Sequence, residues 1–345
     1  MSTKKTQTAD ASVEQDALLV AIDDGYAQTK LVGESPDGTL TKFMTRSSVR
    51  SGRYGLVSLS GTGGIGSYET EEGETFTVSE DIESEGTQFD SFHVSTMNRV
   101  LVNHALMAAG YSGKSVRLIT GLPVADYFFD GLRDEEKIAA KRANLLKGVA
   151  NTASNHPVAK LVGVRVGCQA VAAFVDYYLD DQYNERDVPV GKVAVVDVGG
   201  RTTDVAMIRN GSEFDDAVSG TANLGVLDVY KSLSKAVRTH FRTRDEYPLT
   251  VLDAAVRSKT ITLWGEKHDI AALVDDVVQE QEVKIAREVE RRLGTASSVD
   301  RVLFVGGGSA LFANIASHFK NGQMAPDPEF ANARGLFKFA KKFGD

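Results

Sequence analysis

The feature that most constrains this chain is a pattern that occurs twice. An apolar strand runs into an aspartate, then into glycine and a small polar loop, and then into a second apolar strand. The two copies are LLVAIDDGYAQTKLV, residues 18–32, and VAVVDVGGRTTDVAMI, residues 193–208. Gly38 follows Asp23 by 15 positions, and Gly211 follows Asp197 by 14, so each hairpin reaches a glycine turn at a matched distance. Two such hairpins predict a duplicated domain that holds one ligand from both sides.

The loops of these hairpins suit a nucleoside triphosphate. Glycine lets the backbone approach closely, so that successive N–H groups can point at phosphate oxygens. An aspartate repels phosphate, so Asp23 and Asp197 fit here only if Mg²⁺ lies between, usually held through water. Lys30 would balance the remaining phosphate charge, and Thr202 and Thr203 offer hydroxyl groups. A single strand with Asp-Gly is common in α/β proteins, and the matched pair is what indicates phosphate binding.

A third segment follows the two hairpins in the sequence. In VLFVGGGSAL, residues 302–311, an apolar strand runs into three glycines and then into a helical pattern. Backbone without side chains can pack there against a flat base or sugar. The order of the three segments strengthens the prediction of a nucleotide site.

This order resembles that of the actin, Hsp70 and sugar-kinase superfamily. Within it, the chain most resembles the plasmid-segregation actins of the ParM/StbA family. The segments that carry this closer resemblance are AIDDGYAQTK (21–30), ITGLPVADYF (119–128), KRANLLKGV (141–149), VVDVGGRTTD (195–204), NLGV (223–226) and VGGG (305–308). They are spread in family order over nearly the whole chain.

The resemblance implies an α/β, actin-like fold of two related domains. Each domain would contain a mixed central sheet, with a nucleotide cleft between them. Residues 1–16 are expected to be a disordered leader, 17–190 domain I and 191–325 domain II. An outer subdomain at about 40–95 would face neighbours in a filament, or else be a solvated decoration. A C-terminal helix over 329–343 would pack back on domain I.

The resemblance also assigns the site residues. The nucleotide would be bound by Asp24, Gly25, Tyr26, Ala27, Lys30, Gly199, Gly200, Arg201, Thr202, Gly225, Gly306, Gly307 and Gly308. The last three would line the adenosine pocket, with Gly225 near the ribose. Asp23 and Asp197 would act in catalysis by organising Mg²⁺ and its water shell.

Gln169 is the third expected catalytic residue, because it stands at the corner where this superfamily places the group that orients the attacking water. Relatives of the ParM type commonly have glutamate there. Glutamine orients water but is a poor base, so we expect slow turnover that neighbours stimulate by tightening the cleft. Ala27 stands where relatives often have a hydroxyl residue, so backbone N–H groups must supply the phosphate contacts there. ATP is the expected nucleotide, and the missing hydroxyl leaves GTP as an alternative.

Composition limits the partners and the compartment. The net charge of −8 argues against direct binding to DNA, so a DNA-bound adaptor would supply the basic surface. A single cysteine, Cys168, excludes a disulfide framework within the chain and favours a reducing bacterial cytoplasm. The apolar stretches fall short of the ~20 residues that a membrane-spanning helix needs.

These observations predict a polymerising ATPase. Its filaments of identical subunits would push plasmid copies apart through the adaptor of a partition locus. A small-molecule kinase on the same scaffold is one alternative, for which Asp204 offers a catalytic aspartate. A nucleotide switch that forms no filament is another. The fold alone does not separate the three.

Overall fold

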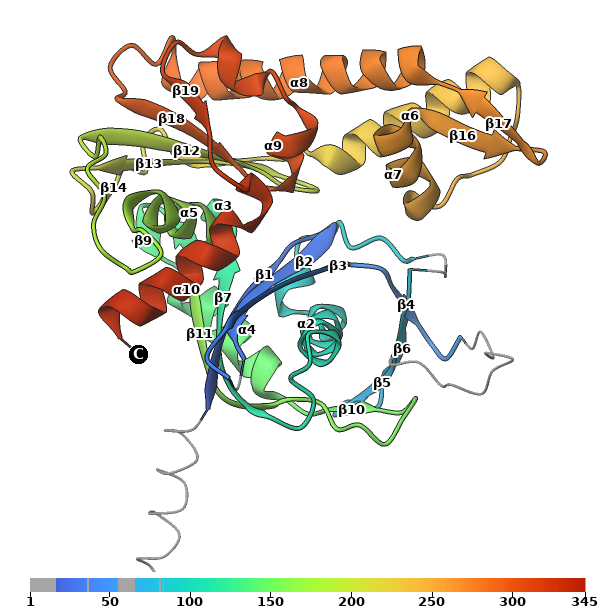
Figure 1. Cartoon of the computed structure of the whole chain (residues 1–345), viewed down its shortest axis with the longest axis horizontal. Coiled ribbons are helices and arrows are strands. Elements are labelled where there is room, and N and C mark those ends of the chain that lie inside the picture. The colour runs from blue at the N-terminus through green and yellow to red at the C-terminus, as the bar shows by residue number, and fades with distance from the viewer. Residues whose placement is uncertain (1–16, 36, 55–65, 81, 83, 345) are drawn as a thin grey trace, which may run out of the picture. The chain divides into compact units, whose positions relative to one another are not determined.

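The two hairpins that the duplicated pattern predicts are both present in the structure, a computed structural model that describes residues 17–35, 37–54, 66–80, 82 and 84–344. The expected leader, residues 1–16, lies outside the described residues. The chain divides into two units (Figure 1). Unit 1 is the described part of Met1–Arg186 and Phe330–Asp345, and unit 2 is Asp187–Glu329.

The central sheet of unit 1 has five strands in the order β11-β7-β1-β2-β3. β1 forms the first hairpin with β2 and pairs parallel with β7, which pairs parallel with β11. β2 and β3 are antiparallel, so the sheet is mixed. The strands are β1 (Leu18–Asp24), β2 (Gln28–Glu34), β3 (Leu40–Arg46), β7 (Ser115–Leu122) and β11 (Lys160–Cys168).

The apolar run of β1 is continuous because the strand is buried on both faces. Val20 and Ile22 pack on one face with residues of α2 (Thr96–Ala108) and α4 (Glu135–Leu146). Leu19 and Ala21 pack on the other face with residues of α5 (Gln169–Tyr178) and α10 (Ala331–Phe343). Figure 1 shows α10 alongside α5, on the side of β1 away from α2.

A smaller antiparallel sheet in unit 1 has the order β10-β5-β6-β4. Its strands are β4 (Val49–Ser51), β5 (Ser67–Thr70), β6 (Thr75–Val78) and β10 (Val149–Asn151). The fourth strand therefore comes from far downstream of the other three. Tyr68 of β5 is fully buried, and its hydroxyl lies 2.9 Å from Nδ1 of His104 on α2. The remaining short elements are η1 (Phe92–Val94), α3 (Val124–Tyr127), β8 (Phe128–Phe129) and β9 (Leu132–Arg133).

Unit 2 repeats the arrangement of the first hairpin. β12 (Lys192–Val198) pairs antiparallel with β13 (Thr203–Arg209) and parallel with β18 (Arg301–Val305). The sheet order is β14-β13-β12-β18-β19, with β15 also paired to β13. The outer strands are β14 (Glu213–Phe214), β15 (Gly220–Ala222) and β19 (Gly322–Met324). Both units thus contain a mixed sheet built on an antiparallel hairpin, as an actin-like fold requires.

The helices of unit 2 are α6 (Val226–Phe241), α7 (Leu249–Ser258), α8 (Ala271–Leu293) and α9 (Gly307–Leu311). α8 buries Val274, Val277, Ile285 and Val289 at helical spacing, which explains its apolar stripe. The β16–β17 hairpin (Thr260–Leu263 and Glu266–Asp269) and the short helices η2 (Ile315–His318) and η3 (Pro328–Phe330) complete the fold. None of the helices in the described part of the chain combines the length and the hydropathy that crossing a membrane requires.

Candidate functional site

The loop at residues 25–27 joins β1 to β2, and the protein binds its carbonyl oxygens from inside unit 1. Ser47 donates from Oγ to the carbonyl of Gly25 at 2.7 Å and from its backbone N–H to the carbonyl of Ala27 at 2.9 Å. Thr87 Oγ1 donates to the carbonyl of Tyr26 at 2.5 Å. Turning carbonyl oxygens inward suits a phosphate ligand, because like partial charges repel.

Asp23, the last but one residue of β1, is buried and gathers polar groups from three elements. Gln169 Nε2 donates to Oδ1 of Asp23 at 2.8 Å, and Lys30 Nζ lies 3.8 Å from Oδ2. These are three of the residues that the sequence assigned to one site, and the structure brings them together. Asn332 of α10 adds an Nδ2 contact to Oδ2 at 3.5 Å, which no pattern in the sequence indicated.

Gln169 begins α5 directly after β11, at a strand-to-helix corner. The space for its side chain depends on Gly121 of β7, because a Cβ atom there would lie 2.5 Å from Cγ of Gln169. Gly121 belongs to the ITGLPVADYF segment, so the sequence analysis included this glycine but assigned it no role.

The two helices that contact Asp23 are fixed to each other. Arg334 of α10 donates to Asp176 of α5 through Nε at 3.0 Å and through Nη2 at 2.6 Å, and Lys338 Nζ lies 2.9 Å from the same carboxylate. At Gly335, a Cβ atom would lie 1.7 Å from the carbonyl oxygen of Ala172, so only glycine permits this close crossing. The crossing holds Asn332 and the first residue of α5 at one carboxylate.

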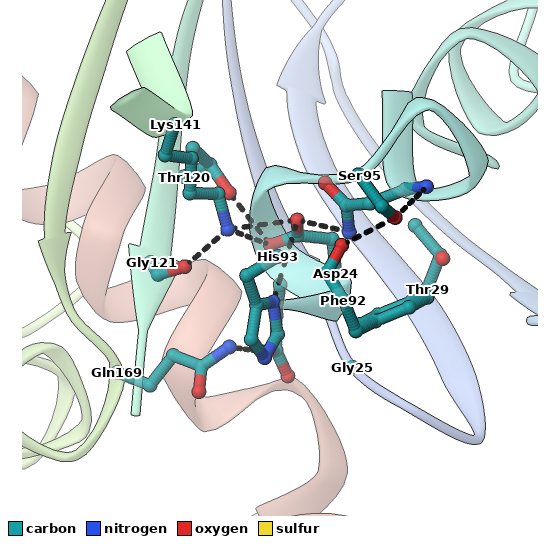
Figure 2. Close-up of polar contacts among 12 residues, drawn as sticks. Asp24, Gly25, Thr29, Phe92, His93, Ser95, Thr120, Gly121, Lys141 and Gln169 are labelled. Atoms are coloured by element: carbon teal, nitrogen blue, oxygen red, sulfur yellow. Dashed lines mark hydrogen bonds and ion pairs between the residues drawn. The ribbon is translucent and has the colours of Figure 1, made fainter. Parts of the chain in front are cut away.

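Asp24 does not occupy the position that the sequence analysis assigned to it. Its side chain is 1% exposed and accepts hydrogen bonds from Thr120 Oγ1 and Asn98 Nδ2, both at 2.7 Å, and from Lys141 Nζ at 2.8 and 2.9 Å (Figure 2). A carboxylate saturated by internal donors does not serve as a nucleotide ligand. The assignment is therefore corrected: Asp24 is an internal anchor of unit 1.

The electrostatics of this cluster keep Asp24 charged and His93 neutral. Burial raises the pKa of Asp24, but the charge of Lys141 and the contact with His93 outweigh it and hold the pKa far below its usual range. His93 is also fully buried, with Nδ1 3.9 Å from Oδ2 of Asp24. Burial, and then the charge of Lys141, lower the pKa of His93.

The loop between β12 and β13, residues 199–202, is held by the start of α6. Gly199 N–H donates to the carbonyl of Thr202 at 2.8 Å, and the first two N–H groups of α6 donate to the carbonyls of Gly199 and Gly200 at 3.1 and 2.9 Å. A Cβ atom at Gly225 would lie 2.3 Å from the carbonyl oxygen of Gly200. Glycine there lets α6 approach the loop, which also contains Arg201. Gly225 is thus brought together with the expected phosphate loop of unit 2.

Asp197, near the end of β12, is buried beside the three glycines that follow β18. Gly306 has φ +88°, and a Cβ atom there would lie 2.2 Å from Oδ1 of Asp197. At Gly308 a Cβ atom would lie 2.6 Å from Cγ1 of Val198, and Gly307 begins α9. The glycines therefore have a packing role next to the carboxylate, in addition to the adenosine contact expected of them.

Two hydroxyl groups expected at the ligand face instead into unit 2. Thr202 Oγ1 donates to Oδ2 of Asp204 at 3.0 Å, and Thr203 Oγ1 donates to the carbonyl of Leu224 at 2.8 Å. Thr221 Oγ1 also contacts Asp204, whose side chain is buried. Asp204 is thus engaged by two threonines, which disfavours the kinase alternative, because a kinase needs this carboxylate open to a substrate hydroxyl.

The carboxylates fit the expected cation in kind and number. Mg²⁺ keeps several waters and is usually bound through one or two carboxylates together with substrate phosphates. Asp23 and Asp197 provide one carboxylate in each unit. Within the described residues, no three or more His, Cys, Asp and Glu side chains are grouped closely enough to hold a metal ion by themselves. A cation at either carboxylate would depend on phosphate and water for its other ligands.

Comparison with known families gives two matches that together span most of the chain. Residues 18–175 match the family described as plasmid segregation protein ParM, N-terminal. Residues 195–317 match the family described as archaeal actin homologue MreB-like, C-terminal. No curated protein matches the sequence.

Solved structures show the same fold over nearly their whole length. A non-polymerisable quadruple mutant of pCBH ParM superposes with a TM-score of 0.74 at 21% identity, covering 95% of this chain and 100% of that one. The archaeal actin homologue Ta0583 in complex with ADP gives a TM-score of 0.74 at 21% identity, with coverages of 94% and 99%.

A subunit of a 15-stranded ParM filament from Clostridium botulinum gives a TM-score of 0.73 at 20% identity, with coverages of 95% and 100%. The two hairpins, the mixed sheets and both family matches all indicate an actin-like fold. The chain therefore has an actin-like fold, and its residues 18–175 resemble the ParM plasmid-segregation family.

Proposed function

We propose that this chain is an ATPase that polymerises with ATP and Mg²⁺ and drives plasmid DNA segregation in the bacterial cytoplasm. The observation that carries the proposal is the convergence of Lys30 and Gln169 on Asp23, at the end of a strand that leads into a glycine loop. The similarity to a ParM filament and to an ADP-bound actin homologue supports it.

In this proposal the backbone N–H groups of residues 25–27 and 200–202 bind the phosphates, while Gly199, whose N–H donates to the carbonyl of Thr202, shapes the second loop. Lys30, now close to the carboxylate of Asp23, contacts the phosphates when they are present. Asp23 and Asp197 hold the water shell of Mg²⁺. When bound, Mg²⁺ neutralises phosphate charge and favours displacement at the terminal phosphorus.

Gln169 orients the attacking water. Its Nε2 donates to Asp23 at 2.8 Å, which fixes the rotation of the amide and leaves Oε1 to accept a hydrogen bond from water. An amide oxygen is a weak base, so the reaction gains from position and charge stabilisation more than from proton removal. Slow hydrolysis follows.

The base and sugar are proposed to lie against unit 2. Gly306, Gly307 and Gly308 would line the adenosine pocket, and Gly225 would lie near the ribose. The positions of Gly225 beside the 199–202 loop and of Gly306 beside Asp197 support this assignment. ATP is the proposed nucleotide, with GTP as the alternative.

The partners are proposed to be other copies of this chain and a DNA-binding adaptor of a partition locus. A net charge of −8 supports an adaptor, because DNA attracts basic and not acidic surfaces. Neither direct DNA binding nor a membrane partner is part of the proposal.

The test follows light scattering and phosphate release together in one sample of the purified chain after adding ATP and Mg²⁺. Scattering that rises and then decays as ATP is spent supports the proposal, and ADP in place of ATP serves as the control. Phosphate release proportional to protein concentration without any scattering would indicate a nucleotide switch. ATP binding with almost no hydrolysis and no scattering would indicate a kinase without its substrate.

A further inference from the structure

Lys141 of α4 is fully buried and yet carries a charge. Its Nζ makes three hydrogen bonds: 2.9 and 2.8 Å to the two carboxylate oxygens of Asp24, and 2.6 Å to the carbonyl of Gly121 (Figure 2). Gly121 lies on β7 and Asp24 on β1. One ammonium group therefore ties a helix to two neighbouring strands of the central sheet.

The carboxylate of Asp24 extends this connection. It also accepts from Asn98 of α2 and from Thr120 of β7. Asp24 is the last residue of β1, and the next residue, Gly25, begins the loop. Four elements are thus joined at the point where the strand gives way to the expected phosphate loop.

The same cluster supports the loop from its other side. The ring of His93 lies 4.9 Å from the ring of Tyr26, centroid to centroid, and its Nδ1 lies 3.9 Å from Asp24. Phe92 packs on Tyr26 at 5.1 Å. Asp24 and Tyr26 flank Gly25, so both neighbours of the loop glycine are anchored in one buried cluster.

Charge gives the arrangement a second effect. Two adjacent carboxylates beside a polyphosphate would repel it, and an unpaired buried carboxylate is costly. Lys141 compensates the charge of Asp24 at hydrogen-bond distance, whereas Asp23 on the opposite face contacts Lys30 at 3.8 Å. The pairing leaves one acidic group of the Asp-Asp sequence to act on a bound cation.

We propose that Lys141 is a positioning residue of the nucleotide site: through Asp24 it fixes the first hairpin loop in the shape that binds phosphate. This inference rests on the proposed function. A role in stability alone would leave the loop at residues 25–27 unchanged in any variant that still folds. A positioning role requires this loop to change when the Asp24–Lys141 pair is removed, even though the chain stays folded.

The test uses a double variant, Asp24→Asn with Lys141→Met. The single change Lys141→Met leaves a buried carboxylate without its ion partner and is expected to fold poorly, whereas removing both charges of a buried pair is often nearly neutral. Tyr68→Phe is the matched control. It removes a buried hydroxyl contact from the smaller sheet of the same unit and leaves β1 unchanged.

The first readout is the affinity for a fluorescent ATP analogue with Mg²⁺, measured on variants whose unfolding transitions remain cooperative. We expect the double variant to bind about tenfold or more weakly than the wild-type chain, since small displacements in a binding site cost this much. Tyr68→Phe should bind as the wild type does. A double variant that binds as tightly as the wild type would overturn the proposal and leave the pair with a role in stability alone.

The second readout needs no nucleotide. Amide hydrogen exchange at residues 25–30 should be faster in the double variant, while exchange at residues 199–203 stays unchanged. If the wild-type chain fails to bind ATP, the proposed function fails, and the exchange measurement still reports on the loop. Unchanged exchange at residues 25–30 would sink the inference independently.

Discussion

Asp23 and Asp24 are neighbours in the sequence, yet their carboxylates lie on opposite faces of one sheet. Asp23 faces α5 and α10, where Gln169 contacts it, and Asp24 faces α2 and α4, where Lys141 contacts it. Side chains alternate along a strand, so a double aspartate places one carboxylate on each side. The two residues are chemically identical and serve different purposes.

Replacing Gln169 by alanine should uncouple nucleotide binding from hydrolysis. The Gln169→Ala chain loses the amide that is proposed to orient water, so phosphate release at saturating ATP should fall about tenfold or more. Affinity for ATP should change little, because the proposed phosphate contacts come from the loops. The exposed Gln182→Ala change is the control. Hydrolysis at the wild-type rate in a Gln169→Ala chain that binds ATP would contradict the proposed role.

The α5–α10 crossing is open to a test at Gly335. A methyl group there would meet the carbonyl oxygen of Ala172 at 1.7 Å, so the helices must separate. We expect a loss of about 1–3 kcal/mol in the free energy of unfolding. Phosphate release should also slow, because Asn332 and Gln169 move away from Asp23.

Gly163→Ala is the matched control for that variant. Gly163 lies on β11 of the same unit, and a Cβ atom there has no neighbour within 4 Å. Urea unfolding and phosphate release should both stay near the wild-type values. Equal effects of the two substitutions would show that the helix crossing is not the cause.

Gly306→Ala should abolish nucleotide binding, because the new methyl group would lie 2.2 Å from Oδ1 of Asp197. The strand-to-helix turn must then move the carboxylate that is proposed to act on Mg²⁺. Gly265→Ala separates this clash from backbone strain: Gly265 has φ +81°, close to the +88° of Gly306, but open space at its Cβ position. Isothermal titration with ATP and Mg²⁺ should give normal affinity for Gly265→Ala only.

Stability should fall between about pH 6.5 and pH 4 because of His104, and His93, whose pKa burial also lowers, adds a loss in the same direction. Burial lowers the pKa of His104 to about 4, so the unfolded chain binds the proton first as the pH falls. The stabilisation is fully present above pH ~6.5 and is lost through pH ~4, a change of about 3 kcal/mol. Below that range Asp24, whose folded pKa is lowered, adds a loss in the same direction.

His104→Gln tests the source of this dependence. Glutamine does not titrate and still offers an acceptor to the Tyr68 hydroxyl. The free energy of unfolding, measured in urea at a series of pH values, should vary less in the variant between pH ~6.5 and pH ~4. An identical slope in both chains would assign the effect to another group.

Much of the framework could be predicted from the sequence, because it depends on local patterns. The two hairpins, the glycines after β18 and the corner at Gln169 follow from apolar runs and glycine positions. The opposite orientations of Asp23 and Asp24 were also readable from the period of two along a strand. The family resemblance, which treats both as site residues, outweighed that signal.

The contacts that complete the cluster were not readable in this way. Lys141 pairs with Asp24 across 117 positions, and Asn332 reaches Asp23 across 309. Lys141 begins the KRANLLKGV segment, but no local pattern gives either residue its role, because that role depends on where a distant helix packs. The place of β10 could not be predicted either, because its partners in the sheet lie far away in the sequence, within residues 49–78.

The return of α10 to unit 1 has a consequence for the newly made chain. The ribosome produces all of unit 2 between the strands of unit 1 and the helix that supplies Asn332, Arg334 and Lys338. The contact of Arg334 with Asp176 spans 158 residues, so it forms only after synthesis has passed unit 2. While unit 2 is being made and folds, the face of the unit 1 sheet that α10 later covers therefore lacks this helix. A nascent chain cannot assemble the full set of contacts around Asp23, so the proposed nucleotide chemistry can begin only once α10 has been made.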